Sequence, residues 1–365
     1  MNKLDIYKNK KVLITGHTGF KGSWLSQWLL QLQAKVYGYA LEAPTNPSLF
    51  GQLKLSEEMD CYLNDVRDLK ALKTCIDEVK PDIIFHLAAQ SLVRDSYEDP
   101  INTIETNING TVNVLEAVRQ LGISTTIVVI TSDKCYENKE WIHGYRENDA
   151  MGGYDPYSMS KGAAELVVSS YRRSFFNPKD YKKHGVKLAS ARAGNVIGGG
   201  DWAKDRIIPD CMRALQKGEE IIVRNPYATR PWQHVLESLG GYLFLGCTLL
   251  EAKDDLIEIL CSGFNFGPFT TSNKNVESLV TAVLENWPGK WKYNESEAVH
   301  EAFLLNLNID KAVQILNWQP VWGFDSTIKN TVDWYYHQHN SNNAKDITVS
   351  QIISYQKDFL NKMTN

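Results

Sequence analysis

Short apolar runs alternate with amphipathic stretches along the first half of the chain. Runs rich in β-branched and aliphatic residues predict buried strands, and they lie at Lys11–Thr15, Lys35–Ala40, Ile83–Leu87, Ile127–Ile130 and Val186–Ala191. Apolar residues at helical spacing predict intervening helices, the first from Trp24 to Leu32 and later ones over residues 69–79, 103–119 and 160–175. Strands that alternate with helices predict a parallel sheet covered on both faces. The expected fold class is therefore α/β, a doubly wound sheet of the Rossmann type.

This rhythm ends near residue 195. Glycines at 198–200 and proline-containing loops follow, with mixed helix and strand signals. We expect residues 1–195 to form the sheet domain and residues 196–365 to form mainly a smaller domain over the carboxyl ends of the strands. The segment 257–264 is also compatible with a late strand of the first sheet.

Composition narrows the class of protein. The chain has 365 residues, 43% of them hydrophobic, and a formal net charge of −4, which gives no overall attraction for nucleic acid or an anionic membrane. The longest apolar run, 239–250, is shorter than the roughly 18 residues of a membrane span, and the N-terminus lacks the apolar core of a secretory signal. Six cysteines without C-x-x-C spacing predict reduced thiols in a cytoplasmic protein. No metal site is expected, because His337 and His339 lack accompanying ligands.

A glycine-rich turn follows the first predicted strand and precedes a helix. Glycines at this position let the backbone approach a pyrophosphate closely, while the N–H groups of the helix N-terminus face the anion. Glu42, twenty positions after Gly22, is a candidate partner for a ribose hydroxyl, and no arginine cluster is present to receive a 2′-phosphate. We therefore expect NAD as the cofactor rather than NADP. The residues of the turn are Gly16, His17, Thr18, Gly19, Phe20, Lys21 and Gly22.

Two residues of this turn are larger and more polar than a dinucleotide site usually holds. Lys21 either pairs with phosphate or weakens the grip on the cofactor by its bulk, and His17 adds a second polar ring. We expect the second effect, and hence weaker NAD binding than small or aliphatic residues would give.

Tyr157-Ser-Met-Ser-Lys161 places a phenol and an amine on one face of a predicted helix. An ammonium group and a cationic nicotinamide beside the phenol favour the phenolate and are expected to lower its pKa. Tyr157 is therefore the candidate general base, with Lys161 as its partner and Ser132, at the end of a predicted strand, as a third group.

These motifs fall in the order found in one enzyme family. The chain resembles the extended short-chain dehydrogenases/reductases, in their nucleotide-sugar branch, over roughly residues 10–337. Besides the turn and the tyrosine–lysine pair, the resemblance rests on Asp65-Val66, His86-Leu-Ala-Ala-Gln90, Thr106-Asn107-Ile-Asn-Gly-Thr111, Arg192-Ala-Gly-Asn195 and Arg230-Pro-Trp-Gln-His.

The resemblance implies further site residues and an assembly. Asp65 and Val66 would contact the adenine. Residues that would line the cofactor cleft are Ala88, Ala89, Gln90 and Asn107, and residues that would hold the nucleotide sugar are Arg94, Ser132, Asn195, Arg206 and Arg230. A homodimer through a four-helix bundle, built from residues 103–119 and the helix of Tyr157, is also implied.

Asp133-Lys134, directly after Ser132, bears on the reaction. The family's 4-epimerases usually have no charged pair here, whereas its 4,6-dehydratases do. Enzymes acting on deoxythymidine-diphosphate sugars carry Asp-Glu, so Asp-Lys favours the branch that acts on CDP-glucose. The choice of cytosine as the base of the nucleotide sugar rests on resemblance. Three alternatives remain: a 4-epimerase, a GDP-mannose 4,6-dehydratase and an inactive NAD-sensing regulatory protein. The absence of basic residues after the second strand argues against the GDP-mannose enzyme.

The implied chemistry is a dehydration without net oxidation, a first step toward deoxysugars such as those of lipopolysaccharide O-antigen. Tyr157, assisted by Ser132 and Lys161, takes the 4-hydroxyl proton while hydride passes from C4 to NAD. Asp133 protonates the C6 hydroxyl as it leaves, and hydride returns to C6. Lys134 either removes the C5 proton, which requires a lowered pKa, or stays charged and stabilises the enolate. We favour the first role.

Overall fold

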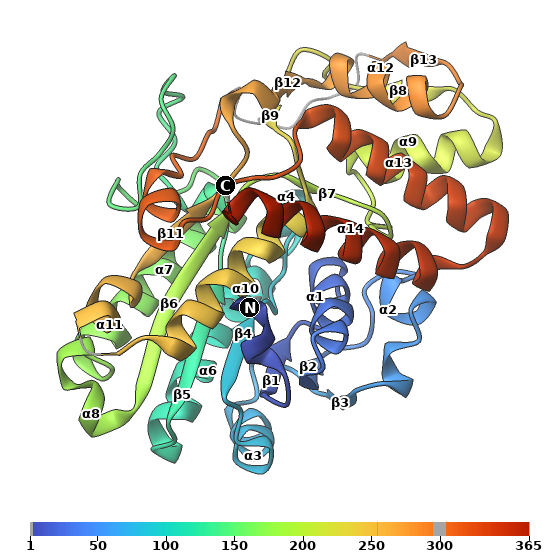
Figure 1. Cartoon of the computed structure of the whole chain (residues 1–365). Coiled ribbons are helices and arrows are strands. Elements are labelled where there is room, and N and C mark those ends of the chain that lie inside the picture. The colour runs from blue at the N-terminus through green and yellow to red at the C-terminus, as the bar shows by residue number, and fades with distance from the viewer. Residues whose placement is uncertain (1–2, 254, 295–303, 365) are drawn as a thin grey trace.

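A seven-stranded parallel sheet forms the centre of the protein (Figure 1), in a computed structural model that describes residues 3–253, 255–294 and 304–364. The strand order is β11-β6-β5-β4-β1-β2-β3, with every neighbouring pair parallel. The strands are β1 (Lys11–Thr15), β2 (Lys35–Ala40), β3 (Asp60–Leu63), β4 (Ile83–His86), β5 (Thr125–Ile130), β6 (Val186–Ala193) and β11 (Gly263–Phe266). The predicted α/β, doubly wound fold is confirmed.

Helices cover both faces of this sheet, so its strands are buried on both sides. In β1, Val12 and Ile14 belong to one hydrophobic core and Leu13 belongs to the other, as expected when successive side chains point to opposite faces. The helices α3 (Leu69–Val79), α6 (Gly110–Leu121) and α7 (Pro156–Ser174) cover one face, and α1 (Phe20–Gln31) and α10 (Val235–Glu251) cover the other. The C-terminal α14 (Ala344–Thr364) packs across α1.

The helix expected over residues 103–119 is divided. It consists of α5 (Pro100–Ile104), a π-helical turn η3 (Glu105–Asn109) and α6. Pro100 occupies the first turn of α5, and the Asp99 carboxylate accepts a hydrogen bond from the backbone N–H of Asn102, so this helix begins earlier than the apolar pattern indicates. π-turns inside helices often occur at functional sites, and this one carries Asn107.

A segment from the second half of the chain returns to the sheet, as its pattern had allowed. After α11 (Asp255–Leu260), strand β11 pairs with β6 along its edge. Strand β3, by contrast, was not predicted, because it has only four residues and none of its side chains is fully buried.

A smaller group of elements lies beyond the carboxyl ends of the strands (Figure 1). Its helices pack on one another, and its short strands pair as β7 with β10, β9 with β12 and β8 with β13. The group comprises β7 (Val196–Ile197), α9 (Ile207–Lys217), β8 (Ile221–Val223), β9 (Thr229–Pro231), β10 (Gln233–His234), β12 (Asn273–Asn275), α12 (Val276–Asn286), β13 (Trp291–Tyr293) and α13 (Phe324–Ser341).

Short helices fill the connections. They are η1 (Lys3–Tyr7), α2 (Leu49–Gln52), η2 (Leu55–Glu57), α4 (Val93–Glu98), η4 (Asp133–Cys135), η5 (Pro178–Asp180), α8 (Tyr181–His184), η6 (Thr270–Ser272) and η7 (Ala312–Leu316).

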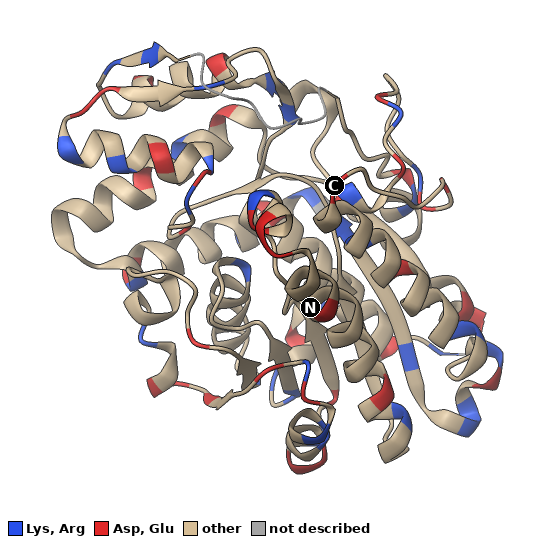
Figure 2. Ribbon diagram, turned by 180° about the vertical axis from the view of Figure 1, so that it is seen from behind, with Lys and Arg blue, Asp and Glu red and all other residues tan. Residues whose placement is uncertain are grey.

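Surface charge and sulfur chemistry agree with the composition. In the view of Figure 2, basic and acidic residues are interspersed over the elements. All six cysteines are free thiols. No helix among the described residues has the length and apolar character that crossing a membrane requires.

Candidate active site

The glycine turn between β1 and α1 is packed tightly against its surroundings. Gly16 adopts a left-handed φ of +78°, and a Cβ there would lie 2.7 Å from the backbone nitrogen of Ala88. A Cβ on Gly22 would lie 2.1 Å from the carbonyl oxygen of Gly16. Neither position has room for a side chain, so Gly16 lets the turn approach the loop after β4, and Gly22 lets α1 begin close against the turn itself.

The same turn fits a dinucleotide pyrophosphate. Gly19 is the N-cap of the twelve-residue helix α1 and supplies no side-chain cap, so the first N–H groups of the helix are available to an anion. A Cβ on Gly19 would meet only the Gly16 oxygen, at 3.4 Å. The backbone in front of α1 is therefore accessible to a phosphate group, as the cofactor prediction requires.

His17 is buried beneath the turn and stays uncharged. Burial lowers its pKa to about 4, and its ring packs edge-on against Phe50, with centroids 5.3 Å apart. A Cβ on Gly38 would lie 2.4 Å from this ring, so β2 leaves no space between them. His17 thus supplies no positive charge for a pyrophosphate. The neighbouring Thr18 donates a hydrogen bond to the carbonyl oxygen of Leu41.

Lys21 lies against α10, close to the predicted catalytic groups. Its Nζ donates a hydrogen bond to the Tyr242 hydroxyl at 3.3 Å. Burial, together with the charge of Arg206, lowers the pKa of Lys21 to about 7, while the Asp133 carboxylate acts in the opposite direction. Its amine is therefore only partly protonated near neutral pH. Phe20, the neighbour of Lys21 at the start of α1, lies beside Gly198.

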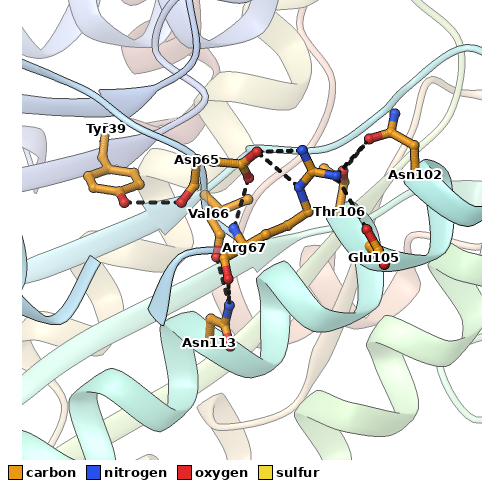
Figure 3. A network of polar contacts seen from close by, with 8 residues as sticks. All are labelled: Tyr39, Asp65, Val66, Arg67, Asn102, Glu105, Thr106 and Asn113. Atoms are coloured by element: carbon orange, nitrogen blue, oxygen red, sulfur yellow. Dashed lines mark hydrogen bonds and ion pairs between the residues drawn. The ribbon is translucent and has the colours of Figure 1, made fainter. Parts of the chain in front are cut away.

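The loop predicted to contact adenine is fixed by an arginine (Figure 3). The Asp65 carboxylate accepts hydrogen bonds from Arg67 Nε at 2.9 Å and Arg67 Nη2 at 2.6 Å, and Arg67 Nη1 donates to Asn102 at 3.1 Å. Asn113 on α6 donates to the carbonyl oxygens of Val66 and Arg67. The hydrogen bonds from Arg67 lower the pKa of Asp65, so an ionised acceptor is held at this place. Sequence reasoning did not identify Arg67.

Glu42, the candidate ribose partner, is exposed just after β2, beyond the glycine turn. Asn107 is buried behind the loop that follows β4. Its Nδ2 donates to the Gln90 carbonyl at 3.0 Å and to Ser160 Oγ at 2.8 Å, and its Oδ1 accepts from the Gln90 N–H at 2.8 Å. Asn107 thereby connects the loop containing Ala88 and Ala89 to helix α7.

The structure brings the predicted catalytic residues together. Tyr157 and Lys161 are buried near the start of α7, with Lys161 Nζ 5.9 Å from the centre of the Tyr157 ring. The loop after β5 lies beside them. Within this loop Ser132 Oγ donates to Asp133 Oδ1 at 2.9 Å and accepts from the backbone N–H of Lys134 at 3.3 Å.

Burial dominates the electrostatics of this group. The pKa of Tyr157 is raised to about 12 by burial, which the Asp133 charge reinforces and the Ser132 hydrogen bond and Arg206 charge oppose. This direction is opposite to the one expected from the sequence, because burial of the phenol outweighs the cations that the protein itself supplies. Burial lowers the pKa of Lys161 to about 8 and raises the pKa of Asp133.

The predicted substrate residues divide into two sets. Arg206 forms an ion pair with Asp201 at 2.8 Å, and its charge acts on Tyr157 and Lys21, so it belongs to the catalytic neighbourhood. Arg94 pairs instead with Asp205 at 3.3 Å. Arg230, in β9, donates to the Thr229 carbonyl. Asn195 lies between β6 and β7, on the same connection as Gly194, where a Cβ would approach Asp133 Oδ2 to 2.8 Å.

Comparisons with known proteins agree with this arrangement. The sequence profile of the GDP-mannose 4,6-dehydratase family matches residues 13–331. The chain belongs to this family. The resemblance to extended short-chain dehydrogenases/reductases is thereby confirmed. One relative, CDP-glucose 4,6-dehydratase from Salmonella typhimurium, is 52% identical over 333 residues, which cover 91% of this chain and 92% of that protein.

Solved structures show the same fold. The dTDP-glucose 4,6-dehydratase from Bacillus anthracis, in complex with NAD, is 19% identical, with a TM-score of 0.74 over 92% of this chain and 99% of that one. An epimerase, Mth375 from Methanothermobacter thermautotrophicus, is 21% identical, with a TM-score of 0.77 over 93% and 95% of the two chains.

The sequence analysis did not assign a role to two buried residues, Glu165 and Arg192. Glu165 continues the interval of four from Tyr157 to Lys161 along α7, which is the signal that points to it. It forms a buried ion pair with Arg192, a residue that had served only as part of a motif.

The two glycines at the entrance of α1 provide a matched pair of variants for the dinucleotide site. We expect Gly22→Ala to lower the melting temperature, because its Cβ would overlap the Gly16 carbonyl. Gly19→Ala is expected to fold normally and to bind NAD at least about tenfold more weakly, because its methyl group occupies the approach to the helix N-terminus. Thermal unfolding and NAD titration measure both effects. Unchanged NAD affinity in Gly19→Ala would place the pyrophosphate elsewhere.

Proposed function

We propose that the protein converts CDP-glucose to CDP-4-dehydro-6-deoxyglucose with NAD as a regenerated cofactor, acting as a hydro-lyase. The observation that carries this proposal is the loop Ser132-Asp133-Lys134, in which Ser132 and Asp133 are buried beside Tyr157 and Lys161. A 4-epimerase needs only hydride transfer at C4 and proton transfer at the 4-hydroxyl group, whereas an acid and a second charged group at this position supply the chemistry of elimination. The 52% identical relative carries the assignment of the cytidine nucleotide.

The residues present fit NAD, which when bound takes up hydride from C4 of the sugar and returns it at C6. The helix N-terminus at Gly19 would hold the pyrophosphate, and the Asp65 carboxylate would accept a hydrogen bond from the adenine amino group. Asn107 keeps the loop of Ala88 and Gln90 in place beneath it. Glu42 remains the proposed ribose partner at the outer end.

Tyr157 acts on the 4-hydroxyl group. Its oxygen removes the hydroxyl proton as the carbonyl forms at C4, and Ser132 hydrogen-bonds to the same reacting oxygen. Lys161, with a pKa of about 8, is mostly protonated at neutral pH and stabilises the phenolate. Arg206 adds a second cation that favours the ionised phenol.

Asp133 and Lys134 complete the dehydration. The 4-ketone makes the C5 proton acidic, Lys134 removes this proton, and Asp133 protonates the C6 hydroxyl, which leaves as water. Burial raises the pKa of Asp133, so the carboxyl group retains a proton more readily than an exposed aspartate would. A proton returns to C5 as C6 is reduced, and the net change is the loss of one water. The alternative for Lys134 is to remain charged and stabilise the enolate.

The nucleotide sugar would lie between the catalytic loop and the elements beyond the sheet. Arg206 is the nearest proposed ligand for its diphosphate, with Arg94, Asn195 and Arg230 as further contacts. In this arrangement residues 1–195, completed by β11, bind the cofactor, and most of residues 196–365 bind the substrate. Six free thiols support a cytoplasmic location.

We also propose a homodimer through α7 and the helical segment of α5, η3 and α6, which contains residues 103–119 and packs on α7. Both helices leave large apolar side chains in solvent: Ile101 is 68% exposed and Leu166 is 61% exposed. Tyr97 on the adjoining α4 and Met159 on α7 extend this surface. Two helical pairs facing each other across a twofold axis would bury these residues in a four-helix arrangement.

Turnover of CDP-glucose tests the proposed function. Protein incubated with CDP-glucose and NAD is expected to produce a 4-keto sugar, detected by the absorbance that it develops in alkali. Tyr157→Phe should reduce kcat by at least about a hundredfold, because the variant cannot accept the hydroxyl proton. Parallel assays with UDP-, GDP- and dTDP-glucose test the preference for the cytidine nucleotide. Preference for another nucleotide, or full activity in Tyr157→Phe, would contradict the proposal.

Exchange at C5 tests the role of Lys134. In deuterated water, Lys134→Met is expected to lose incorporation of deuterium at C5 by at least about a hundredfold while still reducing NAD transiently, because the base that follows oxidation is missing. Mass spectrometry of the sugar and the NADH absorbance provide the two readouts. A normal exchange rate would leave enolate stabilisation as the role of this residue.

A charge introduced on the exposed helix face tests the dimer. Leu166→Asp is expected to convert the protein to monomers at micromolar concentration, because burying a carboxylate in an apolar interface is costly. Ile353→Asp is the matched control, since Ile353 is 55% exposed on α14, a helix outside this surface. Sedimentation velocity distinguishes the two states. Equal behaviour of the two variants would remove α7 from the interface.

A further inference from the structure

Behind the catalytic loop lies an ion pair that no step of the proposed reaction uses. Arg192 Nη2 on β6 and Glu165 Oε2 on α7 are 2.8 Å apart, and their side chains are 6% and 4% exposed. Such a pair loses the hydration of both charges, so a buried ion pair is by itself weak support for stability. Its hydrogen-bond partners indicate another role.

Glu165 holds the beginning of the catalytic loop. Its Oε1 accepts a hydrogen bond from Thr131 Oγ1 at 2.5 Å, and Thr131 directly precedes Ser132. Its Oε2 accepts from Ser190 Oγ on β6 at 2.8 Å, in addition to Arg192. The carboxylate therefore connects α7 to the ends of β5 and β6.

Arg192 holds the end of the same loop. Its Nη1 donates to Tyr136 Oη at 2.6 Å and to the Glu147 carbonyl at 2.9 Å. Tyr136 follows Lys134 by two residues, and its hydroxyl donates to Asn265 Oδ1 on β11 at 2.8 Å. The two members of one ion pair thus grip the two ends of the segment that contains Ser132, Asp133 and Lys134.

Glu165 also lies on the helix that carries the tyrosine and lysine. It is one turn beyond Lys161 and two turns beyond Tyr157, and its charge raises the pKa of Lys161 against the effect of burial. A rigid helix and a loop clamped at both ends by the same pair have a fixed separation. Misplacement of reacting groups by about 1 Å can cost a hundredfold in rate.

We propose that Glu165 and Arg192 are positioning residues that set the distance between the Tyr157–Lys161 pair and the Ser132–Lys134 loop. This inference rests on the proposed function, because it concerns the groups to which that function assigns the chemistry. Neither residue needs to touch the substrate: Glu165 acts through Thr131, and Arg192 acts through Tyr136.

Substitutions at the outer partners test this role without leaving a buried charge unpaired. Thr131→Val removes the hydroxyl that Glu165 holds, and Tyr136→Phe removes the hydroxyl that Arg192 holds. Ser190→Ala is the matched control, because it removes a hydrogen bond of the same length range from Glu165 that does not involve the loop. Thr131→Ser restores the hydroxyl.

We expect Thr131→Val and Tyr136→Phe to lower kcat by at least about tenfold with KM for CDP-glucose changed by less than about twofold. Ser190→Ala and Thr131→Ser should remain within about threefold of the parent enzyme. The two losses should fall on different steps. Thr131→Val mainly slows transient NADH formation, which depends on Ser132, and Tyr136→Phe mainly slows exchange at C5, which depends on Lys134.

Acylation of lysines, followed by mass spectrometry, gives a readout that needs no substrate. A displaced loop should change the labelling rate of Lys134 in Thr131→Val and Tyr136→Phe but leave it at the parent value in Ser190→Ala. Losses in Thr131→Val and Tyr136→Phe no greater than in Ser190→Ala, or unchanged Lys134 labelling, would overturn the positioning role. Absence of turnover in the parent enzyme with altered labelling in the variants would contradict the proposed function alone.

Discussion

The parallel register of β1, β4, β5 and β6 is the constraint on which the site depends. Thr15 of β1 pairs with His86 of β4, His86 pairs with Val129 of β5, and Val129 pairs with Ser190 of β6. Four loops consequently leave the sheet at the carboxyl ends of these strands, where open α/β sheets bind their ligands. These loops carry the glycine turn, the Ala88–Gln90 segment, the Ser132–Lys134 segment and Gly194–Asn195, so groups far apart in the sequence become neighbours.

At the carboxyl ends of the strands, burial shifts the pKa values of several charged side chains. Lys21 interacts with the buried Asp133, Lys161 with the buried Glu165, and Arg206 is paired with the buried Asp201. Burial lowers the pKa values of Lys21 and Lys161, whereas the charge of Asp201 raises that of Arg206. The charge of Arg206 favours ionisation of the Tyr157 hydroxyl, which burial opposes. The chemistry of the site therefore depends on a balance between desolvation and locally concentrated cations.

Much of this arrangement could be predicted from the sequence. Strands β1 and β2 begin and end where the apolar runs do, and the spacing of Tyr157 and Lys161 places both side chains on one face of α7. The π-turn at Asn107 could not be predicted, since a single rare turn spans too few residues to give a periodic signal of its own. Arg192 escaped notice because its partner Glu165 lies on another element, whereas Arg67 was not singled out although its main partner, Asp65, is only two residues away. The direction of the Tyr157 pKa was wrong because charge contacts can be read from spacing, whereas burial depends on the whole fold.

Strand β11 has a consequence for how the protein is made. It forms the edge of the sheet beside β6, yet it is synthesised about seventy residues later, after the α10 helix. Until β11 emerges from the ribosome, β6 presents an unpaired edge to other chains. Asn265, which accepts a hydrogen bond from the Tyr136 hydroxyl, is part of that strand. A nascent chain that stops short of it would contain every residue assigned to catalysis but would lack the outermost support of the loop on which three of them lie.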